Sequence, residues 1–272
     1  MTTNDVLIRG EIRESPSRAG LRLALGGEWT KFWSVRSTRW TLVALALVTY
    51  GLCYLSTTAL RGHAHAADPI MRVLVGFNFG QFSVGVLGVL FLSSEFGTGQ
   101  IRSTIAVMPR RSIVLAAKAI VIGGVGLVLG EVLSFSTFLL GHLILSGQAV
   151  QVSLAQPGVL RVLFESGVDL ALMGLIGLGV AALVRSTAAS ISIFTSIMLV
   201  LTVVLFALPG AIVNAISRYL PANVSSTVFS ATTPSRFQGT PIFSATTGLL
   251  VLALYAVVLL GIGGWLMIRR DT

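Results

Sequence analysis

The segment SIVLAAKAIVIGGVGLVLGEVLSFSTFLLGHLILS, residues 112–146, decides the fold of this chain. Within this long apolar run only Lys118 and Glu131 carry charge. A helix needs about 20 apolar residues to cross the hydrocarbon core of a bilayer, so this run is longer than one crossing requires and too short for two with a turn. We therefore predict one transmembrane helix that continues into water at one end.

Five more apolar runs of transmembrane length surround this segment, at residues 40–60, 72–92, 161–184, 188–208 and 243–268. The whole chain has 54% hydrophobic and 11% charged residues, with a mean hydropathy of +0.88. A soluble domain has about 25% charged residues, so a water-soluble protein is excluded. The sequence predicts an all-α integral membrane protein whose six transmembrane helices occupy residues 40–268.

The basic residues indicate the orientation of these helices. Most of the 19 Lys and Arg residues precede the first run, lie in the loop at residues 93–111, or follow the last run in the tail at 269–272. By the positive-inside rule, both termini and this loop are expected on the cytoplasmic side. Nucleic-acid binding is disfavoured because these cations flank apolar runs instead of clustering on one folded surface.

The chain before the first run divides into two parts. Residues 1–20 alternate in charge and contain few apolar side chains, which predicts a disordered arm. Residues 21–39 place Leu21, Leu25 and an aromatic pair at helical spacing, which predicts an amphipathic helix in the membrane interface. It would anchor the chain to lipid, contact a partner protein, or do both. The side chains expected to act there are Glu28, Trp29, Lys31 and Trp33.

The loop at residues 93–111 contains residues that interrupt helices. Gly97 and Gly99 weaken a helix, and Pro109 removes a backbone donor, so we expect a short separate helix near residues 100–107. Its arginines offer planar, bidentate donors suited to carboxylates on another protein. The alternative is a solvated basic loop retained by the orientation rule. The arginines concerned are Arg102, Arg110 and Arg111.

The order of these elements resembles the permease subunits of type-2 ABC exporters, particularly those of high-GC actinobacteria. The resemblance is carried by GGEWTKFWSVRSTRW at residues 26–40 and by EFGTGQIRSTIA at residues 95–106. It implies that the loop forms a coupling helix that docks into a groove of a separate ATP-hydrolysing subunit. The resemblance implies contacts for Glu95, Phe96, Thr98, Ile101, Arg102 and Ser103. The predicted coupling set also includes the glycines and the remaining arginines of this loop, which are Gly97, Gly99, Arg110 and Arg111.

The resemblance also implies a complex of two permeases, identical or related, with two copies of an ABC ATPase subunit, in a bacterial plasma membrane. The chain has no Walker-type phosphate-binding loop, so ATP and Mg²⁺ are expected in the partner and no cofactor in this chain. The predicted function is export of a lipophilic or amphipathic solute, such as a drug, antibiotic, lipid or peptide. The alternative is a non-transporting anchor or sensor that recruits an ATPase for signalling or resistance.

Polar residues inside apolar runs are costly and mark candidate functional positions. Asn78 and Gln81 share one stripe of the second run, and Arg161, Glu165 and Asp169 recur every four residues and can pair along one helix. Glu131 has no cation nearby on its own helix. It either faces a polar cavity and contacts substrate, or is a protonated carboxyl bonded to a neighbouring helix. The candidate pathway residues are Asn78, Gln81, Glu131, Glu165 and Asp169.

Four further expectations follow from the remaining residues. The external segment at 209–242 has apolar residues at helical spacing from residue 211 to 219, which favours a short re-entrant or interfacial helix over a simple surface loop. Glycine pairs such as Gly126 and Gly130 permit close helix packing. Cys53 is expected to be a buried, inert thiol. No nucleophile with a base, and no set of metal ligands, is visible at membrane depth, so we expect neither a catalytic nor a metal site.

Overall fold

The computed structural model describes residues 16–60, 68–100, 111–147, 151–208, 210–231, 236–237, 240–241 and 243–269. Six helical segments in this part of the chain are long and apolar enough to cross a membrane, as predicted. They are α2 (Arg36–Thr58), α4 (Phe77–Gly97), α6 (Arg111–Leu145), α7 (Val159–Val184), a fifth span made of α8 (Thr187–Thr195), η3 (Ser196–Val200) and α9 (Leu201–Ala207), and α12 (Ala245–Arg269).

Shorter elements connect these spans. They are α1 (Pro16–Ser34), α3 (Pro69–Val73), α10 (Ala211–Ser217), α11 (Pro221–Ser226) and the two-residue antiparallel pair β1 (Arg236–Phe237) and β2 (Thr240–Pro241). The helix predicted within residues 211–219 is confirmed by α10, and α11 is a second short helix that the sequence analysis did not predict. In α11, Asn223, Val224 and Ser225 are buried.

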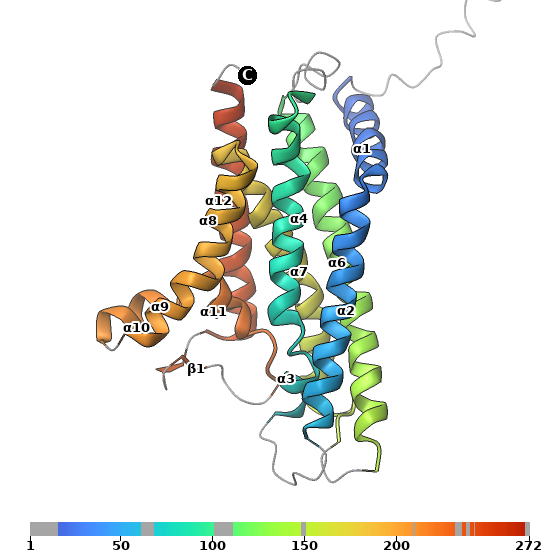
Figure 1. Ribbon diagram of the computed structural model, residues 1–272, viewed down its shortest axis with the longest axis vertical. Helices are drawn as coiled ribbons and strands as arrows, with labels where there is room; N and C mark the ends of the chain where they lie inside the picture. Colours follow the sequence, from blue (N-terminus) through green and yellow to red (C-terminus); the bar gives the residue numbers. More distant parts are fainter. Residues whose placement is uncertain are drawn as a thin grey trace, which may run out of the picture.

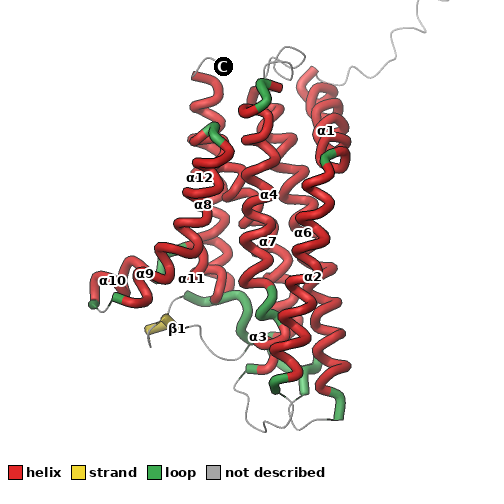
Figure 2. Tube along the Cα trace, in the orientation of Figure 1, coloured by secondary structure: helices red, strands yellow, loops and turns green. Residues whose placement is uncertain are grey.

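Successive spans run up and down as one bundle (Figures 1 and 2). The first described helix, α1, and the end of α12 lie at the same end of the bundle, where α4 also ends and α6 begins (Figure 1). We refer to this end as the basic end and to the other as the distal end. At the distal end, α9 and α10 lean away from the other helices (Figure 1).

The α7 helix lies at the centre and packs against α4, α6 and α12. Its apolar window is 72% buried, whereas the corresponding windows of α2, the fifth span and α12 are 22%, 17% and 17% buried. Glycines permit this packing. A Cβ at Gly88 of α4 would overlap the carbonyl oxygen of Gly174, and one at Gly130 of α6 would lie 2.7 Å from the Cα of Gly167. The predicted role of Gly130 in close packing is confirmed, and its partner is α7 of the same chain.

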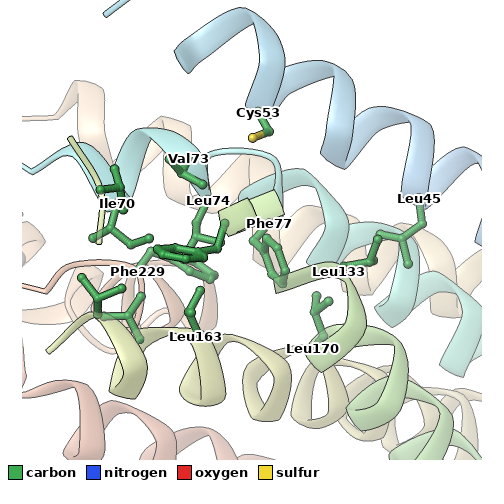
Figure 3. Close-up of a cluster of buried hydrophobic side chains, with 14 of the residues drawn as sticks. Leu45, Cys53, Ile70, Val73, Leu74, Phe77, Leu133, Leu163, Leu170 and Phe229 are labelled. Carbon is green, nitrogen blue, oxygen red and sulfur yellow. The ribbon is translucent and has the colours of Figure 1, made fainter. Parts of the chain in front are cut away.

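A large apolar core lies between the helices at the distal end (Figure 3). Phe77 of α4 and Phe229, which follows α11, lie with their ring centres 6.0 Å apart. Leu45 of α2 and Leu163 of α7 complete this core from opposite sides. Cys53 is buried and unoxidised at its edge, as predicted, with its Sγ 3.6 Å from the Thr137 carbonyl oxygen.

The element boundaries differ from the predictions at two places. The second span begins at Phe77 and not at residue 72, because residues 74–76 form a turn in which Gly76 packs directly on the backbone of Thr49. It then continues to Gly97, which makes Glu95 part of the helix. The predicted break after this point is confirmed by Gly99, which has a left-handed φ of 71°.

The amino-terminal helix also differs in extent. It begins at Pro16, inside the stretch predicted as disordered, and ends at Ser34, because Val35 is extended and α2 starts at Arg36. Proline is favoured in the first turn of a helix, which accounts for this start. Several predictions fall outside the described residues. They concern residues 1–15, the short helix near 100–107 with Ile101, Arg102 and Ser103, Arg110, and the tail after Arg269.

Candidate functional site

Four charged side chains from three helices meet at the basic end. The Lys118 ammonium of α6 lies 2.6 Å from Oε2 of Glu28 in α1 and 2.8 Å from Oε1 of Glu95 in α4. The Lys31 ammonium of α1 lies 3.1 Å from Oε1 of Glu28 and 3.0 Å from Oε1 of Glu95. Each carboxylate therefore binds both ammonium groups. We refer to Glu28, Lys31, Glu95 and Lys118 as the ion-pair cluster.

The cluster is shielded from solvent on most sides. Lys118 is fully buried, Glu28 and Glu95 are 3% and 4% exposed, and only Lys31 reaches the surface, with 31% of its side chain exposed. The ring of Phe91 covers the Lys118 ammonium at 4.4 Å, and Phe32 packs edge-on against Phe91. Because burying an unpaired charge is costly, the two cations and two anions depend on one another to be buried at all.

Local helix geometry explains how the cluster assembles. Glu28 and Lys31 are three residues apart in α1 and so share one face, and Phe32 beside them is fully buried. Lys118 lies about two turns into α6, and α4 extends far enough to present Glu95. The cluster thereby fastens α1, the end of α4 and the start of α6 to one another, on both sides of the loop at residues 101–110.

Lys31 shows the electrostatic balance at the rim of the cluster. Burial by itself would lower the pKa of its ammonium group, but the hydrogen bond to Glu95 and the charges of Glu95 and Glu28 outweigh that effect. The pKa of Lys31 is therefore raised above its ordinary value of 10.5. Lys31 is held in its charged form at neutral pH.

The last turn of α12 is attached to the same end of the bundle by two arginines. Arg111, at the start of α6, donates from Nη1 to the Met267 carbonyl oxygen at 2.6 Å. Arg185, between α7 and α8, donates from Nη2 to the Leu266 carbonyl oxygen at 3.0 Å. The final carbonyl groups of a helix lack partners within the helix and carry partial negative charge, so cations suit this position.

Three of the predicted coupling residues within the described part of the chain make contacts inside the bundle. Glu95 faces inward to the ion-pair cluster, and Phe96 is partly buried under the Arg185 guanidinium at 5.5 Å. Arg111 binds α12. Of the predicted set within the described residues, Gly97, Thr98 and Gly99 are exposed at the end of α4, where the Thr98 hydroxyl donates to the Ser94 carbonyl oxygen.

The predicted residues of α1 divide between two faces. Glu28 points toward α4 and α6 in the ion-pair cluster, while Trp29 and Trp33 are 50% and 40% exposed and contact each other edge-on at 5.8 Å. The structure separates Glu28 from the two exposed tryptophans, because Lys118 provides the Glu28 carboxylate with a buried partner, and it buries Phe32 on the same side as Glu28.

The candidate pathway residues are not brought together. Gln81 is buried and donates to the Asn78 carbonyl oxygen of its own helix at 3.0 Å, while its stripe of α4 packs against α7 and Phe194 of α8. Glu131 lies against Gly167 of α7, and no donor in the described part of the chain reaches its Oε2 atom.

The charged series along α7 pairs only in part. Arg161 lies 3.7 Å from Glu165, and its Nη2 donates to the Ser230 carbonyl oxygen at 3.2 Å. The Asp169 side chain is fully buried and faces Ser225 of α11, so it does not join the pair. The predicted helical pairing is confirmed for Arg161 and Glu165 and wrong for Asp169.

Sequence reasoning missed Lys118 and Arg185 as site residues. A signal for Lys118 existed, since a lysine inside a long apolar run requires an anionic partner, and Glu28 and Glu95 were among the acidic residues predicted for the same side of the membrane. Arg185 carried a weaker signal. Its left-handed conformation, with a φ of 60°, cannot be read from a residue type that seldom adopts it.

Comparison with known proteins adds no family to this description. No protein-family model matches the chain, and no curated protein is significantly similar to it in sequence.

Proposed function

We propose that this chain is the membrane-spanning subunit of an ABC exporter, driven by a separate ATPase subunit that binds at the basic end, which we take to be cytoplasmic. The observation that carries this proposal is the ion-pair cluster. It fastens Glu28 of α1, Glu95 of α4 and Lys118 of α6 into one unit around the loop at residues 101–110. The resemblance of residues 95–106 to the coupling segment of type-2 exporters supports the same assignment.

In this proposal, the ion-pair cluster transmits a displacement of the loop at residues 101–110 to the whole helices α1, α4 and α6. A displaced loop would otherwise bend locally, because its ends join two separate spans. With α1, α4 and α6 linked by buried ion pairs, nucleotide-driven closure of two ATPase subunits moves these helices together. Arg111 and Arg185 extend the linkage to the end of α12.

The translocation path in this proposal lies between two copies of the chain. The described interior is closely packed around α7, which is 72% buried in its apolar window. By contrast, α2, the fifth span and α12 expose long apolar faces. These faces are available to lipid and to a second permease, and a path formed between copies suits a lipophilic or amphipathic solute.

Arg102→Glu tests the proposal, with Arg72→Glu as its matched control. Arg102 belongs to the proposed coupling segment, while Arg72 is exposed on α3 at the distal end. The chain is co-expressed with a candidate ABC ATPase subunit from the same genome, purified in mild detergent and reconstituted. Measurements are recovery of the complex, ATP hydrolysis and ATP-driven movement of ethidium, a lipophilic cation.

We expect Arg102→Glu to lose the complex or its ATP-driven transport, and Arg72→Glu to retain both. Normal assembly and transport by Arg102→Glu would overturn the docking assignment. An assembled wild-type complex that hydrolyses ATP but moves neither ethidium nor fluorescent lipids or peptides would instead favour the anchor or sensor function.

A further inference from the structure

Asp169 is a fully buried acidic residue in α7, the most deeply buried span of the bundle. Neither of its carboxylate oxygens has a hydrogen-bond partner in the described part of the chain. Its polar neighbour is Ser225 of α11, whose buried hydroxyl also lacks a hydrogen-bond partner there. Asp169 therefore differs from Glu28 and Glu95, which are buried together with two cations.

The charged residues of α7 itself do not neutralise a carboxylate at this position. Arg161 lies two turns away, beside Glu165, and its Nη2 atom also donates to the Ser230 carbonyl oxygen. Glu165, one turn away, is itself an acid and shares that arginine. A negative charge on Asp169 would therefore have no counter-charge on its own helix.

The described elements that pack around α7 supply no counter-charge either. There is no titratable side chain in α8 or α11. On α4 and α6, Glu95 and Lys118 bind each other in the ion-pair cluster, and Glu131 is an acid that lies against Gly167. The remaining titratable groups of α6 and α12 contact other parts of the chain, and they are Arg111, His142, Tyr255 and Arg269.

A proton satisfies these conditions better than any other cation. An ionised carboxylate can be buried only where donors or cations replace the water that it loses, whereas a neutral carboxyl group needs no counter-charge. A metal ion needs several ligands, and no group of three or more His, Cys, Asp or Glu side chains in the described residues could hold one. We propose that Asp169 is a proton-binding site and carries a proton in the arrangement seen in this structure.

The burial of this site determines when its proton can exchange. Asp169 and Ser225 are both 0% exposed, so water reaches the carboxyl group only when the surrounding elements separate. Since α11 lies at the distal end, opening there would connect the site to that side of the membrane (Figure 1). One contact that opposes such opening is the hydrogen bond from the Asn223 amide of α11 to the Ser217 carbonyl oxygen, at 2.7 Å. The site goes beyond the proposed transport function and does not depend on it.

Infrared spectroscopy of the full chain tests this site directly, because a protonated carboxyl group has a C=O stretching band that a carboxylate lacks. The protein is reconstituted in phosphatidylcholine vesicles at neutral pH. The chain has four aspartates, so labelling them with ¹³C at the side-chain carboxyl shifts the bands of these four residues alone. Comparison of Asp169→Asn with wild type then assigns the band to one residue. Asp68→Asn is the matched control, since the Asp68 carboxylate accepts two hydrogen bonds.

We expect wild type to show one label-sensitive band of a protonated carboxyl group at neutral pH. Asp169→Asn should lose this band completely, and Asp68→Asn should retain it. In D₂O, the band should shift slowly, because deuterium reaches the site only when the bundle opens. The midpoint of thermal unfolding of Asp169→Asn should stay close to that of wild type, since the amide is neutral and has nearly the shape of a protonated carboxyl group.

Four outcomes would overturn the proposal. Absence of the band in labelled wild type, or its persistence in Asp169→Asn, would mean that Asp169 is ionised. Immediate exchange in D₂O would place the carboxyl group in contact with water. Failure of Asp169→Asn to fold, or a large fall in its midpoint, would show that the fold requires the negative charge. A midpoint that rises with sodium but not with choline, in wild type and not in Asp169→Asn, would assign a sodium ion in place of the proton.

Discussion

The ammonium of Lys118 lies 2.6 Å from the carboxylate of Glu28, a residue 90 positions earlier in the chain. This contact joins the helix that precedes the first span to the longest helix of the bundle. Since Glu95 shares the same ammonium, this fully buried cation joins α6 to both α1 and α4.

Lys118→Met should destabilise the protein strongly. The methionine fills similar space, but Glu28 and Glu95 would remain buried with only Lys31 between them. Removing one partner from a buried charge cluster costs about 3–5 kcal/mol. A lowered midpoint of thermal unfolding in detergent, followed by tryptophan fluorescence, would register this loss.

Lys31→Met provides the matched comparison. Lys31 binds the same two carboxylates but is partly exposed, so its loss leaves Lys118 in place and water can compensate. Its midpoint should fall by clearly less than that of Lys118→Met. Equal midpoints for the two variants would contradict the central position that we give to Lys118.

The contribution of Lys31 to stability should depend on pH only in alkaline solution. Its pKa is raised in the folded protein, so folding favours the protonated form. That contribution is complete below the ordinary pKa of 10.5 and is lost as the pH rises through the folded value. The difference in unfolding midpoint between wild type and Lys31→Met should therefore stay constant around neutral pH and shrink only above about 10.5. A difference that disappeared near neutral pH would argue against this pairing.

Hydropathy was sufficient to predict the six spans, because the length of an apolar run has a direct physical meaning in a bilayer. The break after Gly97 and the short helix α10 also followed from local residue chemistry. The pairing of Glu95 was not predictable in the same way. It depends on a lysine on another helix, and helical spacing describes which residues share a face without saying which helix that face meets.

The start of the second span shows a similar limit. Apolar character extends from residue 72, but the chain turns at residues 74–76, where Gly76 packs on the backbone of Thr49. This contact is tertiary, so composition around Arg72 contains no sign of it. For Asp169, regular spacing from Glu165 predicted a pair along α7, whereas the side chain is buried near Ser225 of α11 and neither of its carboxylate oxygens has a hydrogen-bond partner in the described part of the chain.

Gly88→Ala should disrupt the packing of α4 on α7, although it adds only one methyl group. The new Cβ would overlap the Gly174 carbonyl oxygen, and a backbone atom cannot move aside as the end of a side chain can. Overpacking of this kind costs about 1–3 kcal/mol or more. Gly51→Ala, on α2 with no neighbour within 4 Å, is the control and should unfold at the wild-type temperature. Thermal unfolding in detergent separates the two, and an unchanged midpoint for Gly88→Ala would contradict the close approach of these helices.

Asp68→Ala should loosen the segment that follows α11 without affecting the ion-pair cluster. The Asp68 carboxylate accepts a hydrogen bond from the Ser230 hydroxyl at 2.6 Å and another from the Ala231 backbone amide at 3.0 Å. Hydrogen bonds to a charged group contribute about 1.5–3 kcal/mol each, so their loss should increase local opening by at least tenfold. Hydrogen–deuterium exchange measured by mass spectrometry should become faster in peptides that contain Ala231 and stay unchanged in peptides that contain Lys118. Since Asp68 and the cluster lie at opposite ends of the bundle, faster exchange at both would mean that the whole fold had been weakened and would contradict a local anchoring role (Figure 1).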